Sequence, residues 1–314
     1  MQDIFERCCE NPLITAENLS FRASAVYNPA AVEHDGGVVL LVRVEDPRGF
    51  SSIHVARSKD GITNWKVEPQ PMLAYGLPDM RYETKGCEDA RVTYLPEDDC
   101  YCICYVAYSG VGPAVGLART GEFTDVERLS LILSPPNKDT VMFPEKIADR
   151  YMVLHRPVAG DKEHIWSACS PDLLHWGTPH CVVQERGGPW WDGVKVGAGP
   201  PPIRTEDGWL LLYHGVKKFG GNMVYRVGAA LLDHREPHKM LGRTPGWIFG
   251  PSAGYETNGY MPNVVFPCGC LVRGDELWMY YGAADTSVCL ARARLGDVIA
   301  QVQEVSGSAA GPCC

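Results

Sequence analysis

The chain has 314 residues, of which 45% are hydrophobic and 21% are charged, and its formal net charge is −9 at pH 7. This composition indicates a folded globular protein, and the acidic balance argues against a nucleic-acid-binding surface, which requires a basic stripe. Residues Met1–Arg7 contain no apolar signal core, and no segment approaches the roughly 20 apolar residues of a membrane span. We therefore expect a cytoplasmic protein with neither a nucleic-acid nor a membrane partner.

The 13 cysteines predict reduced thiols, with neither disulfides nor a metal centre. Metal sites usually space their ligands as C-x₂₋₄-C with a partner pair, and the sequence contains no such set. Cys100, Cys102 and Cys104 alternate along an apolar run, so we expect them on one face of a strand as small apolar side chains. The cysteine-rich end Gly311–Cys314 carries no interpretation.

Short β-type runs recur along the chain between frequent glycine and proline residues. They lie at Val38–Val44, Tyr101–Tyr108, Tyr151–His155, Trp209–His214 and Leu277–Tyr281. Long amphipathic helix patterns are missing. Many short strands separated by turn residues predict an all-β architecture.

Each of these runs is followed by a second strand that is rich in small residues. The second strands lie at 53–61, 115–120, 165–172, 226–231 and 287–293. Five units at a spacing of roughly 50–60 residues predict a five-bladed β-propeller. We expect one domain over 1–314, with 1–15 as an N-terminal extension and 300–314 as a C-terminal tail. The alternative is a pair of β-sandwiches in which similar strings recur by coincidence.

One polar stretch, Lys85–Val92, concentrates two acids and a guanidinium just before a strand-like run. In a regular strand, Asp89 and Arg91 share one face and Glu88 points away. A carboxyl group beside cations at a strand end suits acid-assisted chemistry on an oxygen leaving group. An ordinary structural ion pair has the same appearance, so this stretch alone leaves both readings open.

Further polar clusters follow in a fixed order, as functional residues scattered over the blades of a propeller should. They are Tyr27–Ala31, Arg43–Gly49, Glu88–Arg91, Asn137–Asp139, Phe143–Lys146, His155–Pro157, Lys195–Pro202, Tyr213–Gly215, Tyr225–Arg226, Met261–Phe266 and Tyr280–Asp285. This series resembles glycoside hydrolase family 130, the inverting β-mannoside phosphorylases, from about Asn11 to Asp297. The resemblance implies a five-bladed propeller that cleaves a β-mannosidic bond with inorganic phosphate and releases α-mannose 1-phosphate. It implies no metal or organic cofactor.

A phosphorylase needs a different set of residues from a hydrolase. An inverting hydrolase uses an acid and a base, whereas phosphate is already an anionic nucleophile and needs cations to hold it. By resemblance, the phosphate-side residues are Lys138, Arg156, Lys195 and His214, with Tyr225 as a hydroxyl donor. The family often carries Arg-Asn where this chain has Lys138-Asp139, and lysine supplies a point charge in place of a fork.

Asp89 matches the general acid of the family, in which the proton is thought to pass through a hydroxyl of the bound mannose. Glu88 is the alternative acid. On the sugar side, the resemblance places Asn28, Arg48 and Asp285 at the −1 subsite, with Arg43, Glu88 and Asp139 as further substrate-side candidates. Pro262, Asn263 and Phe266 are expected to line the channel near the acceptor. Trp190-Trp191 fits either a sugar platform or a buried aromatic pair.

The amino-acid sequences of the 43–49 and 55–61 stretches are similar to those of family members that act on β-1,2-linked mannobiose and mannooligosaccharides. The expected partners are a β-mannooligosaccharide, inorganic phosphate and mannose 1-phosphate, in either direction of the reaction. A β-mannoside hydrolase, a mannosyltransferase that uses a sugar nucleotide, and a mannan-binding propeller without catalysis remain alternatives. Retention of Arg156, Lys195 and His214 argues against the hydrolase. The oligomeric state is left open, with a homo-oligomer as one option.

Overall fold

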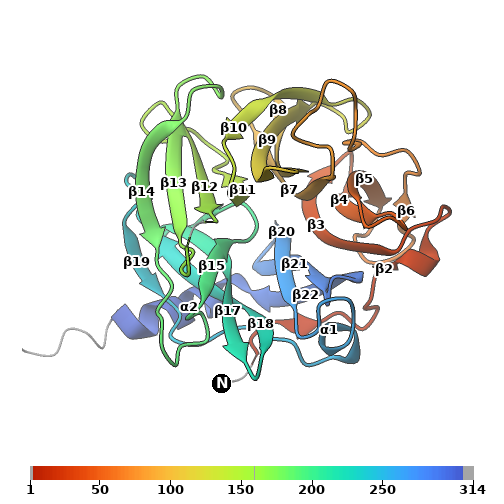
Figure 1. Ribbon diagram of the computed structural model, residues 1–314. Helices are drawn as coiled ribbons and strands as arrows, with labels where there is room; N and C mark the ends of the chain where they lie inside the picture. The colour runs from red at the N-terminus through yellow and green to blue at the C-terminus, as the bar shows by residue number, and fades with distance from the viewer. Residues whose placement is uncertain (1–2, 159, 307–314) are drawn as a thin grey trace, which may run out of the picture.

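The computed structural model describes residues 3–158 and 160–306, and these residues are mainly β-strand (Figure 1). The helical segments are η1 (Ala16–Asn18), α1 (Gly254–Thr257) and α2 (Leu295–Ser306). The prediction of a mainly β protein is confirmed. No helix in the described residues is long and apolar enough to cross a membrane. Gly311–Cys314 and the rest of 307–314 lie outside the described residues.

The described strands form five antiparallel meanders. The first consists of β3 (Ala25–His34), β4 (Gly37–Glu45), β5 (Ser51–Ser58) and β6 (Lys66–Val67), and the second of β7 (Gly86–Leu95), β8 (Cys100–Ser109), β9 (Gly112–Thr120) and β10 (Glu127–Leu133). The third consists of β11 (Asn137–Met142), β12 (Tyr151–Pro157), β13 (Ile165–Ser170) and β14 (Gly177–Val183). The fourth consists of β15 (Lys195–Ala198), β17 (Trp209–Phe219), β18 (Asn222–Leu232) and β19 (Met240–Arg243), with β16 (Ile203–Arg204) beside β17. The fifth consists of β20 (Val265–Arg273), β21 (Glu276–Ala283) and β22 (Ser287–Arg294).

The beginning of the chain completes the fifth meander. β1 (Glu6–Arg7) and β2 (Ile14–Thr15) both pair with β22 in antiparallel register. The segment expected as an extension is therefore part of a sheet that also contains the last strand of the chain. Within the expected tail, residues up to 306 belong to α2, whose buried Val298 and Val302 pack into the core of the fourth and fifth meanders.

The meanders follow one another around a common centre, with β3, β7, β11, β15 and β20 nearest to it (Figure 1). The five small-residue strands predicted from the sequence are β5, β9, β13, β18 and β22. Each is the third main strand of its meander and not the second. Apart from the strand-like run at 92–95, which belongs to β7, the sequence reading missed the innermost strands because polar and turn-forming residues interrupt their apolar pattern.

Three successive inner strands carry a β-bulge at corresponding positions. One extra residue is inserted in β3 at Asn28, in β7 at Asp89 and in β11 at Asp139. These residues have φ angles of 49°, 48° and 53°, in the left-handed region that asparagine and aspartate tolerate better than most side chains. A bulge breaks the alternation of a strand and redirects a side chain.

The bulge at Asp89 overturns the expected orientation of its neighbours. Glu88 Oε1 and Asp89 Oδ1 both lie 3.1 Å from the guanidinium of Arg43, so Glu88 does not point away from Asp89. Arg91 donates to the backbone carbonyl of Asp89 at 2.6 Å. The expectation that Asp89 and Arg91 form the same-face pair is wrong because the extra residue shifts the alternation between them.

Candidate active site

A cavity of about 120 Å³ lies near the first residues of the five inner strands, and all five meanders contribute to it. Its lining residues are Asn28, Arg43, Asp89, Lys138, Asp139, Arg156, Lys195, Tyr225, Met261, Val264, Phe266 and Asp285. Ten of these twelve are candidates named from the sequence, so residues up to 257 positions apart meet in one place. Met261 and Val264 were not selected, although they belong to the same short cluster as Phe266.

Asp89 is held at one of its two oxygens. Asn28 Nδ2 donates to Oδ1 at 2.8 Å, and Arg43 Nη1 lies 3.1 Å from the same atom. Burial raises the pKa of Asp89, but the nearby charges of Arg43, Lys138 and Arg91 outweigh it and hold that pKa below its ordinary value. Asp89 is therefore a carboxylate in the free protein, with Oδ2 left for other partners.

Asp285 lies in the turn between β21 and β22 and titrates differently from Asp89. Burial and the neighbouring charge of Asp89 raise the pKa of Asp285 to about 6, although Arg43 and Lys138 oppose this effect. Asp89 and Asp285 are thus two carboxyl groups of one cavity whose environments separate their pKa values. Such a separation is common at functional sites.

Arg156 is the most firmly held cation of the cavity. Its Nη1 lies 2.7 Å from Asp139 Oδ2, and its Nε lies 2.8 Å from Glu163 Oε2. Lys138 and Lys195 make no ion pair within residues 3–158 and 160–306. These two ammonium groups are available to a bound anion, beside a guanidinium that is already oriented.

His214 lies behind Arg156 and does not line the cavity. It is fully buried, and its Nε2 is 3.0 Å from Arg156 Nη1. Burial lowers the pKa of His214 well below its ordinary value, and Asp139 offsets only part of this effect. A neutral imidazole accepts at Nε2 when its proton is on Nδ1, so His214 orients Arg156 and adds no positive charge. The sequence grouped it with the cations because burial cannot be read from residue type.

Arg91 contacts residues of three meanders next to the cavity but does not line it. Its fully buried guanidinium donates to the carbonyls of Asp89 at 2.6 Å, Gly199 at 3.2 Å and Ala198 at 3.3 Å. It also lies 5.4 Å from the ring centroid of Phe266. Arg91 therefore ties together β7, β15 and β20 directly under the bulge that carries Asp89.

Besides His214, four candidates lie outside the lining of the cavity. Glu88 pairs with Arg43 behind it, and burial raises the pKa of Glu88. Arg48 is exposed and pairs with Asp46 at 2.8 Å, away from Asp89. Pro262 and Asn263 lie in the segment between Met261 and Val264, which do line the cavity.

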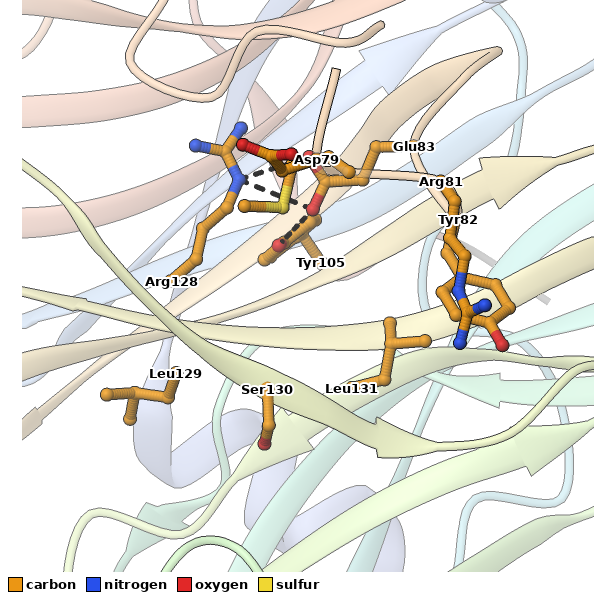
Figure 2. A pocket seen from close by; sticks show the side chains of 10 residues that line it. Asp79, Arg81, Tyr82, Glu83, Tyr105, Arg128, Leu129, Ser130 and Leu131 are labelled. Atoms are coloured by element: carbon orange, nitrogen blue, oxygen red, sulfur yellow. Dashed lines mark hydrogen bonds and ion pairs between the residues drawn. The ribbon is translucent and has the colours of Figure 1, made fainter. Parts of the chain in front are cut away.

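A second cavity of about 260 Å³ lies between the 79–83 segment and β10 (Figure 2). Figure 2 shows Glu83 held between Arg128 and Tyr105, with Tyr105 Oη 2.6 Å from Glu83 Oε1 and Arg128 Nε 3.1 Å from Oε2. The Cys87 thiol donates to Glu83 at 3.3 Å. Because the buried carboxylate is already satisfied and Cys87 is in β7, this cluster anchors the strand that carries Asp89.

The first cavity combines carboxyl groups with unpaired ammonium groups inside a mainly β ring. Such a site defines an enzyme that holds a polar substrate together with an anion. A family model described as β-1,4-mannooligosaccharide phosphorylase matches residues 2–304 of this chain.

Curated relatives and a solved structure agree with that match. The chain is 36% identical to the β-1,2-mannobiose phosphorylase of Listeria innocua, over 94% of this chain and 97% of the relative. It is 35% identical to the 1,2-β-oligomannan phosphorylase of a Thermoanaerobacter species, over 93% and 98%. Its fold is similar to the structure of the Listeria innocua β-1,2-mannobiose phosphorylase in complex with β-1,2-mannobiose, with a TM-score of 0.88 and 34% identity over 96% and 99%. The chain belongs to glycoside hydrolase family 130 and is a glycoside phosphorylase, which confirms the resemblance.

Proposed function

We propose that this enzyme catalyses the reversible, inverting phosphorolysis of β-1,2-linked mannobiose and mannooligosaccharides. Forward reaction releases α-mannose 1-phosphate, and the reverse reaction extends a mannan chain. The observation that carries the proposal is the cavity itself, in which Asp89 and the unpaired Lys138 and Lys195 share one space of about 120 Å³. We also propose that the five meanders are the blades of a five-bladed propeller.

In this proposal, the anion is held by Lys138, Arg156 and Lys195. A bound phosphate already carries the negative charge that a water molecule must acquire from a base, so the site needs orientation more than deprotonation. Asp139 and His214 fix the guanidinium of Arg156 from behind. Lys195 Nζ lies 5.4 Å from the ring centroid of Tyr225, and this proximity supports the Tyr225 hydroxyl as a further donor to the anion.

Asp89 supplies the proton to the leaving oxygen, by relay through a mannose hydroxyl. The charges of three cations hold the pKa of Asp89 below its ordinary value, so Asp89 does not carry this proton in the free enzyme. A phosphate that binds next to Lys138 offsets their charge and raises the pKa of Asp89. The nucleophile therefore helps to prepare the acid, and Oδ2, which Asn28 and Arg43 leave free, is the atom that faces the sugar.

The sugar is held at −1 by Asn28, Arg43 and Asp285, in the part of the cavity nearest to Asp89. Arg48 reaches the sugar only if the turn at Asp46–Phe50 moves toward the cavity. The acceptor lies against Phe266, beside the Pro262-Asn263 segment. Every cysteine in the described part of the chain is a free thiol, which supports a cytoplasmic location.

The proposal of a β-1,2 linkage is supported by the two relatives and by the sequences of the 43–49 and 55–61 stretches. The matching family model, in contrast, is described by a β-1,4 linkage. Purified enzyme should therefore be incubated with β-1,2-mannobiose and β-1,4-mannobiose, each with and without inorganic phosphate. We expect phosphate-dependent release of mannose 1-phosphate from the β-1,2 substrate. Equal turnover without phosphate would establish a hydrolase, and preference for the β-1,4 substrate would overturn the linkage.

The role of Asp89 is tested in the same assay. Asp89→Asn keeps the left-handed backbone and the shape of the side chain but cannot donate a proton, so we expect kcat to fall at least about 10²-fold. Asp125→Asn, at an exposed position on the second meander, is the matched control and should keep wild-type rates. Wild-type kcat in Asp89→Asn would remove Asp89 from the mechanism.

A further inference from the structure

A groove of about 410 Å³ on the fourth meander takes no part in the mechanism above. Its walls combine the aromatic side chains Trp190, Trp191, Phe219 and Trp247 with Lys217 and Arg226. Trp190 is 44% exposed and Phe219 is 77% exposed, which is unusual for side chains of this size. The groove therefore presents flat apolar faces to solvent.

Guanidinium groups hold two of the indole rings in place. The Arg186 guanidinium lies 4.1 Å from the ring centroid of Trp190, and that of Arg226 lies 4.3 Å from the ring centroid of Trp247. Arg186 is itself fixed by the fully buried Asp192, at 2.8 Å. These indole rings are thus pre-oriented in the unbound protein, which lowers the entropic cost of stacking a ligand on them.

Nitrogen donors in the groove wall and beside it lack acceptors in the described part of the chain. Trp191 is only 5% exposed, and its indole Nε1 has no hydrogen-bond partner among the described residues. The same holds for Nη2 of Arg186, the residue stacked on Trp190. A buried N–H without an acceptor destabilises a protein, so such groups point to a missing partner that carries oxygen acceptors.

The groove lies on the same side of the molecule as the catalytic cavity. Lys195 stands at the start of β15, where β17 ends and β18 begins, and the β17–β18 hairpin carries Phe219 at its tip. Tyr225 lines the cavity and the next residue, Arg226, lines the groove, so the two spaces lie on opposite faces of one strand. A chain of linked sugars that leaves the cavity can therefore reach the groove over the edge of this hairpin.

We propose that this groove binds a pyranose ring of a mannooligosaccharide whose other end occupies the catalytic cavity. Pyranose rings offer C–H faces to indole rings, and their hydroxyl groups offer an acceptor to Nε1 of Trp191, which lines the groove. The inference rests on the proposed function, because it takes the substrate to be a mannooligosaccharide. It makes the enzyme selective for chain length through a surface outside the cavity.

The test compares short and long substrates in Trp190→Ala. Phosphorolysis of β-1,2-mannobiose, which cannot span both spaces, should be unchanged and so reports correct folding. KM for the β-1,2-mannohexaose should rise about fivefold to tenfold, the loss expected for one aromatic stacking contact. Trp190→Phe keeps a flat aromatic ring, so its KM for mannohexaose should be close to the wild-type value. Tyr94→Ala removes an exposed aromatic side chain at the far end of β7, and it should leave KM unchanged for both substrates.

Calorimetric titration of mannohexaose without phosphate gives a second readout that needs no turnover. Trp190→Ala should weaken binding by the same factor, and Trp247→Ala should do likewise. If KM for mannohexaose is the same in Trp190→Ala and wild type, or if KM rises by the same factor for both substrates, the groove does not bind the sugar chain. The proposed function would remain intact. A change of oligomeric state in Trp190→Ala would assign the groove to an interface between copies of the chain. If wild-type enzyme does not cleave mannobiose, the proposed function fails. In that case, an unchanged affinity for mannohexaose in Trp190→Ala would also exclude sugar binding in the groove.

Discussion

Asp285→Asn is expected to stabilise the fold at neutral pH while it removes activity. Asp285 is close enough to Asp89 for the negative charge of one to disfavour ionisation of the other. Asparagine has nearly the same shape and cannot ionise, so the substitution removes a buried charge without opening a cavity. The same substitution removes a proposed sugar contact, so stability and turnover should change in opposite directions.

The size of the effect follows from the pKa of Asp285, which is raised from 3.8 to about 6. Because the folded-state pKa lies above the unfolded one, the folded protein retains this proton more strongly, and stability falls as pH rises from 3.8 through 6. Each pKa unit corresponds to about 1.4 kcal/mol, so the penalty is about 0.6 kcal/mol at pH 4 and about 3 kcal/mol at pH 8. Asp285→Asn should recover this penalty.

The assay is urea unfolding of wild type and Asp285→Asn at pH 4, 6 and 8. We expect the difference in free energy of unfolding to grow from about 0.6 kcal/mol at pH 4 to about 3 kcal/mol at pH 8, with most of the rise complete by pH 7. All other groups that titrate are present in both proteins, so the growth with pH reports Asp285 together with its electrostatic coupling to Asp89. A difference that is constant with pH, or destabilisation at pH 8, would refute the raised pKa.

Three further substitutions test how the cavity is held. Arg156→Lys keeps the charge but loses the fork, so KM for phosphate should rise at least about tenfold with a smaller change for mannobiose. Gly282→Ala places a methyl group against the carboxamide of Asn28, so kcat should fall as Asp89 loses its donor. Gly197→Ala places one against the imidazole of His214, so we expect a lower Tm together with a higher KM for phosphate.

These variants have a common control in Gly254→Ala, whose methyl group would meet nothing within 4 Å. Gly254→Ala should keep wild-type kinetics and Tm. Unchanged KM for phosphate in Arg156→Lys would contradict a role for the oriented guanidinium in holding the anion. Wild-type kcat in Gly282→Ala would show that Asn28 can move without affecting Asp89, and wild-type Tm in Gly197→Ala would show the same tolerance at His214.

The sequence predicts which residues meet but not how deep they lie. Alternating apolar runs and turn residues were enough to place β4, β8, β12, β17 and β21, because their side chains follow the period of a regular strand. Motif order was enough to bring Asn28, Lys195 and Phe266 to one cavity. The burial of His214 and the exposure of Arg48 could not be predicted, since both follow from packing between meanders.

The positions that alternation could not predict are the bulged ones, and the reason explains their residue types. A left-handed residue in a strand favours asparagine or aspartate, so Asn28, Asp89 and Asp139 share a backbone requirement before any chemistry is considered. What each side chain faces then decides between amide and carboxylate. Asn28 faces the carboxylate of Asp89 and must donate, whereas Asp89 faces Arg43 and Asp139 faces Arg156, so both must accept. Alanine at any of the three would therefore combine the loss of a polar contact with about 1–2 kcal/mol of backbone strain, and exchange between asparagine and aspartate isolates the chemical part.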